Sequence, residues 1–324
     1  MSWQNAPMLT KLTAAQNGGN RGAQLWGVDV RGKLYTIYQQ TPGGDWSNWM
    51  SIDWAPGNHP KQVYELAAVQ LGDGRIKIWI LDMKREIWTT EQEFAGGTWM
   101  NWWHSTRAKW NNAPDTFKKL AAVHRARAEE PRASGSMFIG VKENGSCAVC
   151  FEARGTWGRF RNDWNGTAGV IECTACQQKD ARMAVWILNE KRELFFSGEQ
   201  TKGTGDFGGW VGPNWLGAPR LRNIAAVEGS QGAILIGQDE DYQVLTNFQS
   251  APGSDKWNGW SAPNWANAPR SYELTACGQN NGLAQIWAVT LRQKLTSIAQ
   301  IEANRWPDKW SHNDDDPYPD PPKK

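Results

Sequence analysis

The feature that most constrains the fold is a tryptophan that returns about every fifty residues, each time just before a short link rich in Asn, Gly, Ala and Pro. These anchor tryptophans are Trp3, Trp54, Trp110, Trp164, Trp215 and Trp265, at intervals of 51, 56, 54, 51 and 50 residues. A repeat of this length indicates a chain built from copies of one supersecondary unit. Six units follow, at about 4–54, 55–110, 111–164, 165–215, 216–265 and 266–312 together with 1–3.

Each unit contains four short segments with the composition of strands. In the first unit they are LTAAQ (12–16), AQLWGVD (23–29), GKLYTIYQQ (32–40) and the Trp-x-x-Trp stretch that leads to the anchor. Polar links such as DVRGK separate the second and third segments and are typical of hairpin turns. Four antiparallel strands per unit, repeated six times, predict an all-β fold, a six-bladed β-propeller in a single domain over residues 1–312.

The composition of the predicted strands and the sequences at the two chain ends both favour a closed ring of blades. The first segment is built from small residues, which suits a crowded axis, and the second is apolar on both faces, which suits a strand between neighbouring blades. The last unit lacks its own anchor segment, whereas the chain begins with SWQNAP. We therefore expect Trp3 to complete the outer strand of the sixth blade and close the ring, which leaves 313–324 as a disordered tail rich in Asp and Pro.

Charge and hydropathy narrow the class of partner. The chain carries 35 Lys and Arg against 33 Asp and Glu without a long run of one sign, which argues against a partner chosen by bulk electrostatics, such as nucleic acid or an anionic membrane. No apolar run approaches the roughly 20 residues needed for membrane insertion, and the N-terminus lacks the apolar core of a signal peptide. The expected location is the cytoplasm, or outside the cell after release without such a peptide.

The five cysteines include two C-x-x-C pairs, Cys147 with Cys150 and Cys173 with Cys176, while Cys277 shares the column of Cys176. The spacing resembles a zinc ribbon, but both pairs fall inside predicted strands. Residues i and i+3 of a strand point to opposite faces, so neither pair is placed to bind one ion. We expect structural thiols and no metal site, and free buried cysteines suit a reducing compartment.

Paired tryptophans three residues apart return at one place in the unit, behind Gly-rich turns such as TPGGDWSNW (41–49). One ring of each pair should pack into the next blade, and the other can face solvent or the cleft between blades. The structural interpretation is packing alone; the functional one is a stacking platform for pyranose rings, because an indole offers a broad rigid face. The candidates are Trp46, Trp49, Trp99, Trp102, Trp210, Trp257, Trp260 and Trp306.

A second column is polar in all six units, at the end of the third segment. Its members are Gln39, Gln92, Glu152, Glu199, Gln249 and Gln300. Such side chains can bond neighbouring backbone, which is a structural role, or hold the hydroxyls of a sugar. In the second case the repeated site gives several weak pockets on one ring, and hence avidity toward clustered ligands.

The stretch GAQLWGVDVRGKLYTIYQQTPGGDWSNW (22–49) resembles the repeat of tectonin and PLL-type β-propeller lectins, and weaker copies of it cover the whole chain. The resemblance implies a multivalent carbohydrate-binding protein with shallow Trp-lined pockets between blades, whose partners are glycans that include fucosylated or O-methylated sugars. It is compatible with an oligomer. Unit three departs from the pattern through the insertion HRARAEEPRASG (124–135) and through Trp157 followed by Phe160, and unit four is also altered.

Two other classes of function stay open. The first segments end in the polar residues Gln16, Gln70, His124, Gln177 and Glu228, with Gly278 in the sixth unit. These should gather at one mouth of an axial channel, where His124 and Glu228 could act as base and acid of an enzyme or in a small-molecule site; a hydrated lining is the plainer interpretation. A propeller can also be a scaffold for protein partners. No nucleophile elbow or phosphate loop is present, so neither catalysis nor a cofactor is expected.

Overall fold

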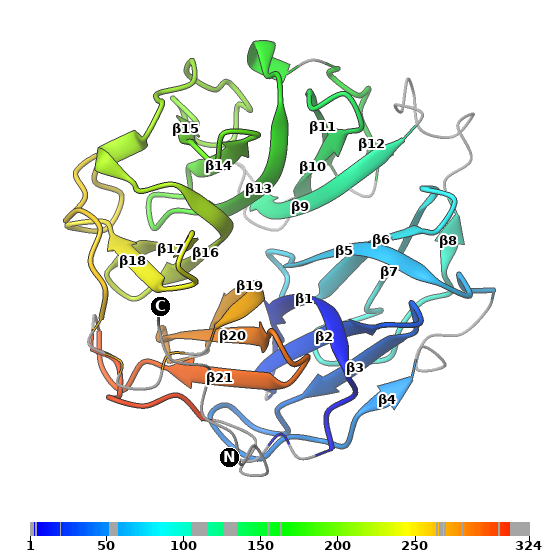
Figure 1. Ribbon diagram of the computed structural model, residues 1–324. Coiled ribbons are helices and arrows are strands. Elements are labelled where there is room, and N and C mark those ends of the chain that lie inside the picture. The colour runs from blue at the N-terminus through cyan, green and yellow to red at the C-terminus, as the bar shows by residue number, and fades with distance from the viewer. Residues whose placement is uncertain are drawn as a thin grey trace.

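The computed structural model describes residues 3, 5–19, 21–51, 58–104, 116–125, 135–153, 156–162, 164–263, 265, 268, 270–279, 281–303 and 305–311. These residues form six antiparallel sheets arranged around an axis, so the six-bladed propeller predicted from the repeat is confirmed (Figure 1). The expected tail at 313–324 and most of the insertion at 124–135 lie outside the described residues. Within them, no helix is long and apolar enough to cross a membrane.

Each blade contributes three main strands in chain order, from the axis outward. Blades 1 to 3 contain β1 (Leu9–Gln16), β2 (Ala23–Asp29), β3 (Leu34–Tyr38), β5 (Val63–Gln70), β6 (Ile76–Asp82), β7 (Ile87–Glu91), β9 (Phe117–Arg125), β10 (Gly135–Lys142) and β11 (Cys147–Ala153). Blades 4 to 6 contain β13 (Val170–Gln177), β14 (Met183–Asn189), β15 (Leu194–Gly198), β16 (Leu221–Gly229), β17 (Gly232–Asp239), β18 (Val244–Phe248), β19 (Ser271–Gly278), β20 (Ala284–Thr290) and β21 (Leu295–Ala299).

The fourth strand is much shorter than the other three. In blades 1 to 3 it is a two-residue strand, β4 (Met50–Ser51), β8 (Trp103–His104) or β12 (Thr156–Trp157). In blades 4 to 6 it is reduced to single bridges, Phe196 with Val211, Thr246 with Ser261 and Ser297 with Ser311. Two 3₁₀ turns, η3 (Trp164–Gly166) and η4 (Trp215–Gly217), contain the anchor tryptophans of blades 3 and 4.

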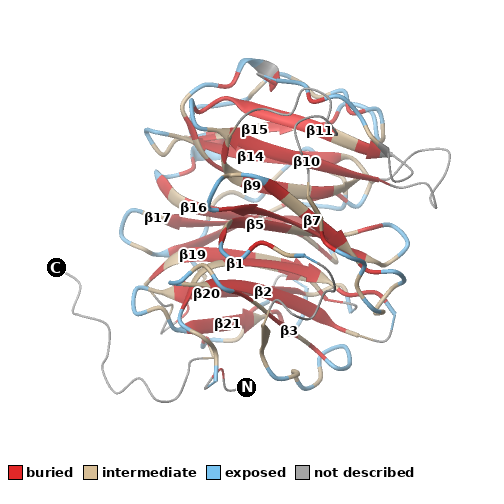
Figure 2. Cartoon of the chain, turned by 90° about the vertical axis from the view of Figure 1, so that its right-hand side faces the viewer, coloured by how far each residue is buried: buried red, intermediate tan, exposed pale blue. Residues whose placement is uncertain are grey.

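The second strand of each blade is the most deeply buried, as its composition predicts. Seen edge-on, the strands are buried and the connecting loops are exposed (Figure 2). Trp26, Trp79, Trp186 and Trp287 of these strands have no exposed surface. Each lies where the sheet of one blade packs against the next, so the apolar core runs around the ring as a series of clusters between blades. Burying such a side chain contributes about 1.5–3 kcal/mol.

The innermost strands share one irregularity, a β-bulge near their start. In blade 1, Leu9 pairs with Asp29 and Lys11 with Val28, so that one extra residue is inserted, and the same shift occurs in the other five blades. The bulge changes the phase of the side chains, because Leu9 now faces the same cluster as Leu12 and Ala14. Apolar residues three apart at the strand start, such as Leu9 and Leu12, are therefore the sequence sign of this bulge.

The N-terminal segment closes the ring, and among its described residues it does so through a side chain and not through the expected strand. The Trp3 indole is 3% exposed and donates a hydrogen bond from Nε1 to Ser297 Oγ of blade 6 at 3.3 Å. Its ring meets Trp46 of blade 1 edge-on, with centroids 5.2 Å apart. The outermost bridge of blade 6 is formed by Ser311 rather than by the N-terminus, so among the described residues Trp3 joins the chain ends through its side chain.

The five cysteines are buried and free, and the members of each C-x-x-C pair face different clusters. Burial raises the pKa of Cys147 to about 11 and of Cys150 to about 12, and it also raises the pKa of the other three thiols. Among the described residues, no group of three His, Cys, Asp or Glu side chains is placed to hold a metal ion.

The native protein should therefore react with a thiol reagent at pH 8 at least about a hundredfold more slowly than the unfolded chain, because the thiolate is the reactive form. Absorbance after addition of an aromatic disulfide reagent, with and without denaturant, measures both rates. Rapid labelling of even one thiol in the folded chain would contradict the burial described here.

Candidate functional site

The first aromatic residue of each Trp-x-x-Trp stretch packs onto the blade that precedes it in the ring. Trp46 contacts Trp287 of blade 6, with centroids 6.0 Å apart, and Trp99 contacts Trp26 of blade 1 at 5.9 Å. Trp257 contacts Trp186 at 5.7 Å in the same way. Trp306, 9% exposed, packs against the anchor Trp265 at 5.7 Å. These rings hold neighbouring blades together, while Trp46, Trp99 and Trp257 each keep a partly exposed surface.

The second aromatic residue also packs between blades, which is the second of the two positions predicted for it, the cleft between blades and not open solvent. Trp102 is 7% exposed, and Trp49, Trp210 and Trp260 are partly buried against the same clusters as their neighbours. The i, i+3 interval predicts opposite faces of a regular strand, but both rings of each pair pack against the same cluster between two blades.

Side chains of the Gln/Glu column bond neighbouring backbone, which is the structural one of the two roles given for them above. All six side chains are 5% exposed or less. Four amides have the same bond: Gln39, Gln92, Gln249 and Gln300 accept through Oε1 from a backbone N–H of the first or second residue of the second strand, at 2.7–2.9 Å. Glu199 does so at 3.1 Å, from Met183 N. This column fastens the third strand to the start of the second.

At the junction between blades 2 and 3, four charged side chains meet beside an indole. Lys77 lies in β6, and its Nζ is 2.7 Å from Glu152 Oε1 and 3.1 Å from Glu91 Oε2. The ammonium also lies 5.1 Å from the centroid of the Trp157 ring. Arg75 donates from NH1 to Glu91 Oε1 at 3.0 Å. Lys77 and Glu152 are buried, whereas Arg75, Glu91 and Trp157 are partly exposed.

The equivalent positions at the other junctions have different chemistry. Lys77 and Glu91 face each other across β6 and β7, and the corresponding pairs are Gln24 with Tyr38, Met137 with Phe151, Ala184 with Gly198, Ile234 with Phe248 and Gln285 with Ala299. At these two strand positions, two junctions have a buried amide and three have only apolar or small residues. Lys77, Glu91, Arg75 and Trp157 were not predicted as site residues. The available signal was the lysine in IKIWILD, a segment that is apolar apart from this lysine and its final aspartate.

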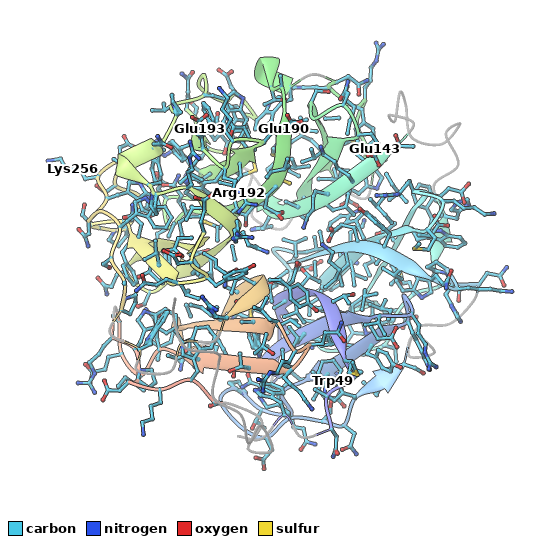
Figure 3. The ribbon with its side chains drawn as sticks, viewed as in Figure 1. Trp49, Glu143, Glu190, Arg192, Glu193 and Lys256 are labelled. Carbon is cyan, nitrogen blue, oxygen red and sulfur yellow. The ribbon has the colours of Figure 1, made fainter. Side chains whose placement is uncertain are left out.

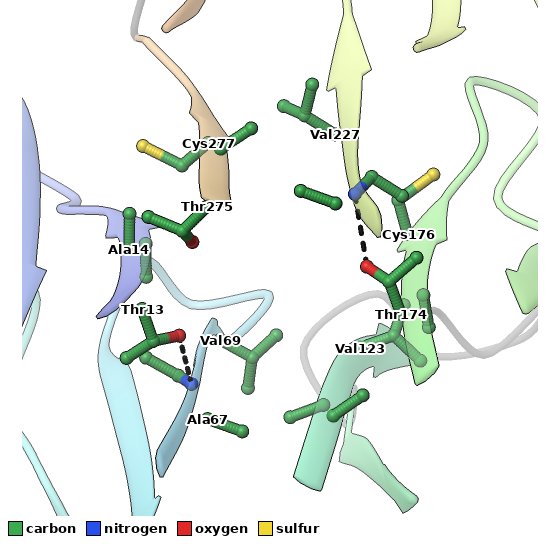
Figure 4. A pocket seen from close by; sticks show the side chains of 18 of the residues that line it. Thr13, Ala14, Ala67, Val69, Val123, Thr174, Cys176, Val227, Thr275 and Cys277 are labelled. Carbon is green, nitrogen blue, oxygen red and sulfur yellow. Dashed lines mark hydrogen bonds between the residues drawn. The ribbon is translucent and has the colours of Figure 1, made fainter. Parts of the chain in front are cut away.

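The axial channel is a cavity of about 550 Å³ lined by the innermost strands of all six blades. Small side chains form its middle part, and two threonines tie adjacent blades together: Thr13 Oγ1 accepts from Ala68 N at 3.1 Å and Thr174 Oγ1 from Ala226 N at 3.0 Å (Figure 4). The residues that face the channel one position later are all alanines: Ala14, Ala68, Ala122, Ala175, Ala226 and Ala276.

The polar ring predicted at one mouth of this channel is present, since Gln16, Gln70, His124, Gln177 and Glu228 all line the cavity. However, His124 and Glu228 do not form an acid–base pair. His124 Nδ1 lies 2.9 Å from Gln177 Oε1, and Glu228 Oε1 is 2.8 Å from Lys179 Nζ. Burial lowers the pKa of His124, only partly offset by the Gln177 contact, which favours the neutral imidazole.

The other end of the channel carries a ring of charge that the sequence analysis did not identify. Directly after each bulge stand Lys11, Glu65, Lys119, Glu172, Asn223 and Glu273, one from each blade. Glu65 Oε2 lies 3.3 Å from both Lys11 Nζ and Lys119 Nζ, and Lys119 Nζ lies 2.8 Å from Glu172 Oε2. Burial would raise the pKa of Glu65, but the two lysines outweigh it and lower the pKa. The ring residues are about fifty positions apart in the sequence, and each of them alone has the character of a solvent-exposed strand residue, so the sequence did not predict that they meet.

A scan against protein-family models found no match to the sequence, and a search of curated proteins likewise found none. Solved structures do match along nearly the whole chain. The fucose-specific lectin from Aleuria aurantia is 15% identical, covers 93% of this chain and 94% of its own, and has a TM-score of 0.63. AofleA from Arthrobotrys oligospora is 12% identical, with coverage of 96% and 88% and a TM-score of 0.65.

The BP39L lectin from Burkholderia pseudomallei is 16% identical, with coverage of 93% and 83% and a TM-score of 0.61. The structure of the Aleuria aurantia lectin is described as a six-bladed β-propeller with a novel mode of fucose recognition. At these identities the likeness concerns the path of the backbone and not particular side chains. The comparisons therefore establish that this chain has the fold of six-bladed β-propeller lectins.

Proposed function

We propose that this protein is a carbohydrate-binding protein without catalytic activity, and that its principal glycan site is the junction of blades 2 and 3. The observation that carries the proposal is the meeting of Arg75, Lys77 and Glu91 with the partly exposed Trp157. The tectonin and PLL-type assignment suggested by the repeat stays a prediction.

The chemistry of this junction suits a pyranose. The C–H face of a sugar ring stacks on an indole, while its hydroxyls need both donors and acceptors at fixed positions. Arg75 presents N–H donors and Glu91 presents carboxylate oxygens, and Lys77 holds that carboxylate in place from below. Hydrogen bonds to charged groups contribute about 1.5–3 kcal/mol each, more than neutral ones. Because Lys77 and Glu152 are already paired and buried, the site is organised before a ligand arrives.

Fucose is the first sugar to test. The solved structures that share this fold include lectins described as fucose-specific or in complex with α-methyl fucoside. At the other five junctions the strand positions of Lys77 and Glu91 hold no charged residue, so we infer weaker sites there. A ring with one strong and several weak sites would bind clustered glycans through avidity.

A glycan array screened with the whole purified chain, followed by competition with free L-fucose, should give saturable binding that the free sugar removes. Glu91→Gln should weaken that binding about tenfold or more, because it removes one charge-assisted contact to the sugar. Glu93→Gln is the matched control, since Glu93 stands two residues away on the exposed loop and bonds only Thr98 among its described neighbours. Both variants must unfold at temperatures close to that of the parent chain.

If Glu91→Gln and Glu93→Gln changed glycan affinity equally, the junction of blades 2 and 3 would not be the glycan site. A blank array with a folded protein would contradict glycan binding itself and would turn attention to the axial channel. In that event His124→Ala and Glu228→Ala become the informative variants, because on the present proposal neither should change glycan affinity.

A further inference from the structure

Three neighbouring hairpins on one face of the propeller expose apolar side chains at their tips. The tips are the turns between the second and third strands of blades 6, 1 and 2, where Leu291 is 46%, Val30 53% and Met83 57% exposed. Met8, at the start of β1, adds a fourth exposed apolar side chain at 56%. The turns lie on the face where the innermost strands begin, because Val63 N of β5 donates to Gly32 O of the blade 1 hairpin at 2.7 Å.

The fold does not require apolar residues at these tips. The same turn position in blades 3, 4 and 5 is Glu143, Glu190 and Glu240, and all three are exposed (Figure 3 labels Glu143 and Glu190). The turns are built alike in both halves of the ring: Asp29, Asp82 and Asp239 each accept backbone N–H groups two and four residues later. The choice of an apolar or an acidic tip is therefore independent of turn geometry.

Basic side chains accompany the apolar tips. Each apolar tip is followed directly by a cation, Arg292, Arg31 or Lys84, and all three are exposed. Lys33, Lys61 and Lys294 are further exposed cations in or beside these hairpins. Among the described residues of the three hairpins, Glu86 is the one exposed acidic residue. The chain as a whole is nearly neutral, with 35 basic and 33 acidic residues, so the balance of the sequence conceals this local excess.

We propose that the hairpin tips of blades 6, 1 and 2 dock onto an anionic lipid bilayer. Apolar tips flanked by Lys and Arg match the boundary between acyl chains and negative head groups, because the tips leave water while the cations stay at the head-group level. This is peripheral attachment and involves no segment that spans the membrane. The acidic tips of blades 3 to 5 keep the opposite half of the face away from the bilayer.

A second copy of the chain fits this surface less well. In a two-fold dimer formed through this face, the cations of one copy could pair with acidic groups only if they lay against the glutamate tips of the other copy. Val30, Met83 and Leu291 would then lie against the same glutamates. That arrangement buries carboxylates on apolar side chains, which is costly. The docking surface lies at the opposite end of the blade from Lys77 and Glu91, since these stand at the far ends of β6 and β7 from Met83. A bilayer and a glycan could therefore be bound together.

The test is co-sedimentation of the full chain with phosphatidylcholine vesicles, with and without phosphatidylserine, in the absence of any sugar. Binding should require phosphatidylserine and should fall with added salt. Arg31→Gln and Arg292→Gln should each lower the partition coefficient about fivefold. The triple change Val30→Ser, Met83→Ser, Leu291→Ser should abolish measurable binding. Lys191→Gln, at the same turn position in blade 4, is the matched control and should leave the partition coefficient within about twofold of the parent value.

Absence of binding to phosphatidylserine vesicles by the folded parent chain would overturn the proposal. An equal decrease of the partition coefficient in Lys191→Gln and Arg31→Gln would also overturn it, because membrane binding would then not depend on the hairpin tips of blades 6, 1 and 2 in particular. If light scattering showed that the parent is a dimer and the triple variant a monomer, with no lipid binding by either, the surface would be an interface between copies. The vesicles carry no sugar, so none of these results depends on the glycan proposal.

Discussion

A chain with Lys119 replaced by methionine should be less stable than the parent by about 3–5 kcal/mol, because the change leaves buried carboxylates without their partner. Lys119 Nζ lies 2.8 Å from Glu172 and 3.3 Å from Glu65 at the charged end of the axial channel. Methionine keeps most of the volume of the lysine stem, so the loss reports charge and not a cavity. Denaturant unfolding followed by tryptophan fluorescence measures the free energy of unfolding directly.

The pH dependence gives this result a second signature. Burial would lower the pKa of Lys119, but Glu172 and Glu65 outweigh it and hold the pKa well above its ordinary value of 10.5. The folded chain thus binds this proton more tightly than the unfolded chain. The contribution of Lys119 to stability is fully present below about pH 10.5 and falls as the pH rises toward the pKa in the folded state. Burial would also lower the pKa of Lys11, but Glu273 and Glu65 outweigh it and raise the pKa. Both chains should therefore lose stability in that range, but the parent should lose more than Lys119→Met.

Glu273→Gln is the matched control, since it removes an opposite charge from the same ring. The ring has three carboxylates and two ammonium groups, so one carboxylate is in surplus, and burial raises the pKa of Glu273. Neutralising it should change the free energy of unfolding far less than Lys119→Met does, or should increase it. An equal destabilisation by both variants would show that the ring acts through packing and not through its charge balance.

The second large effect is expected at the point where the ring closes. Trp3→Ala should lower the free energy of unfolding by about 3–5 kcal/mol, which is typical of a buried tryptophan replaced by alanine. The indole is 3% exposed, contacts Trp46 of blade 1 and donates to Ser297 of blade 6. Its loss removes a contact between the first and last blades and creates a cavity at their junction.

Trp265→Ala separates these two contributions. Trp265 is the anchor of blade 5, is 8% exposed and packs against Trp306 and Trp310 at 5.7 and 5.3 Å. Its truncation leaves a comparable cavity but keeps the chain ends joined. The rate of unfolding should therefore rise more in Trp3→Ala than in Trp265→Ala, because an opened ring exposes two sheet edges. Equal unfolding rates would mean that Trp3 is only one more packing residue.

The sequence was sufficient for the architecture because the architecture is repeated. Six anchors at similar intervals and six similar sets of segments predict the blades, the order of strands and the contact between chain ends. The position of Trp3 was predicted less well: Ser311 supplies the outermost bridge of blade 6, and the interval between anchors could not distinguish a strand from a side-chain contact.

The candidate site was harder to predict for the same reason. A search for columns finds what the six units share, and shared residues such as Gln39 and Gln92 turned out to fasten backbone. Lys77 and Glu91 occur in one blade only, so no column contains them. Their partner Glu152 belongs to the next blade and is 75 residues from Lys77, which places the decisive contact beyond any local pattern. Exposure of the tryptophans likewise depends on two neighbouring blades and not on the alternation within one segment.

The bulge near the start of each innermost strand has a consequence for how neighbouring blades differ. A regular strand would place Leu9 and Lys11 on the same face, and the extra residue between them sends the two side chains to opposite sides. Each inner strand can thus present hydrocarbon to the blade behind it, while its charged side chain meets the charged residues of the blades on both sides. Adjacent blades must then carry opposite charges at this position, as Lys11, Glu65, Lys119 and Glu172 do. Such an agreement fixes which blade can follow which, so the copies of the unit are no longer interchangeable.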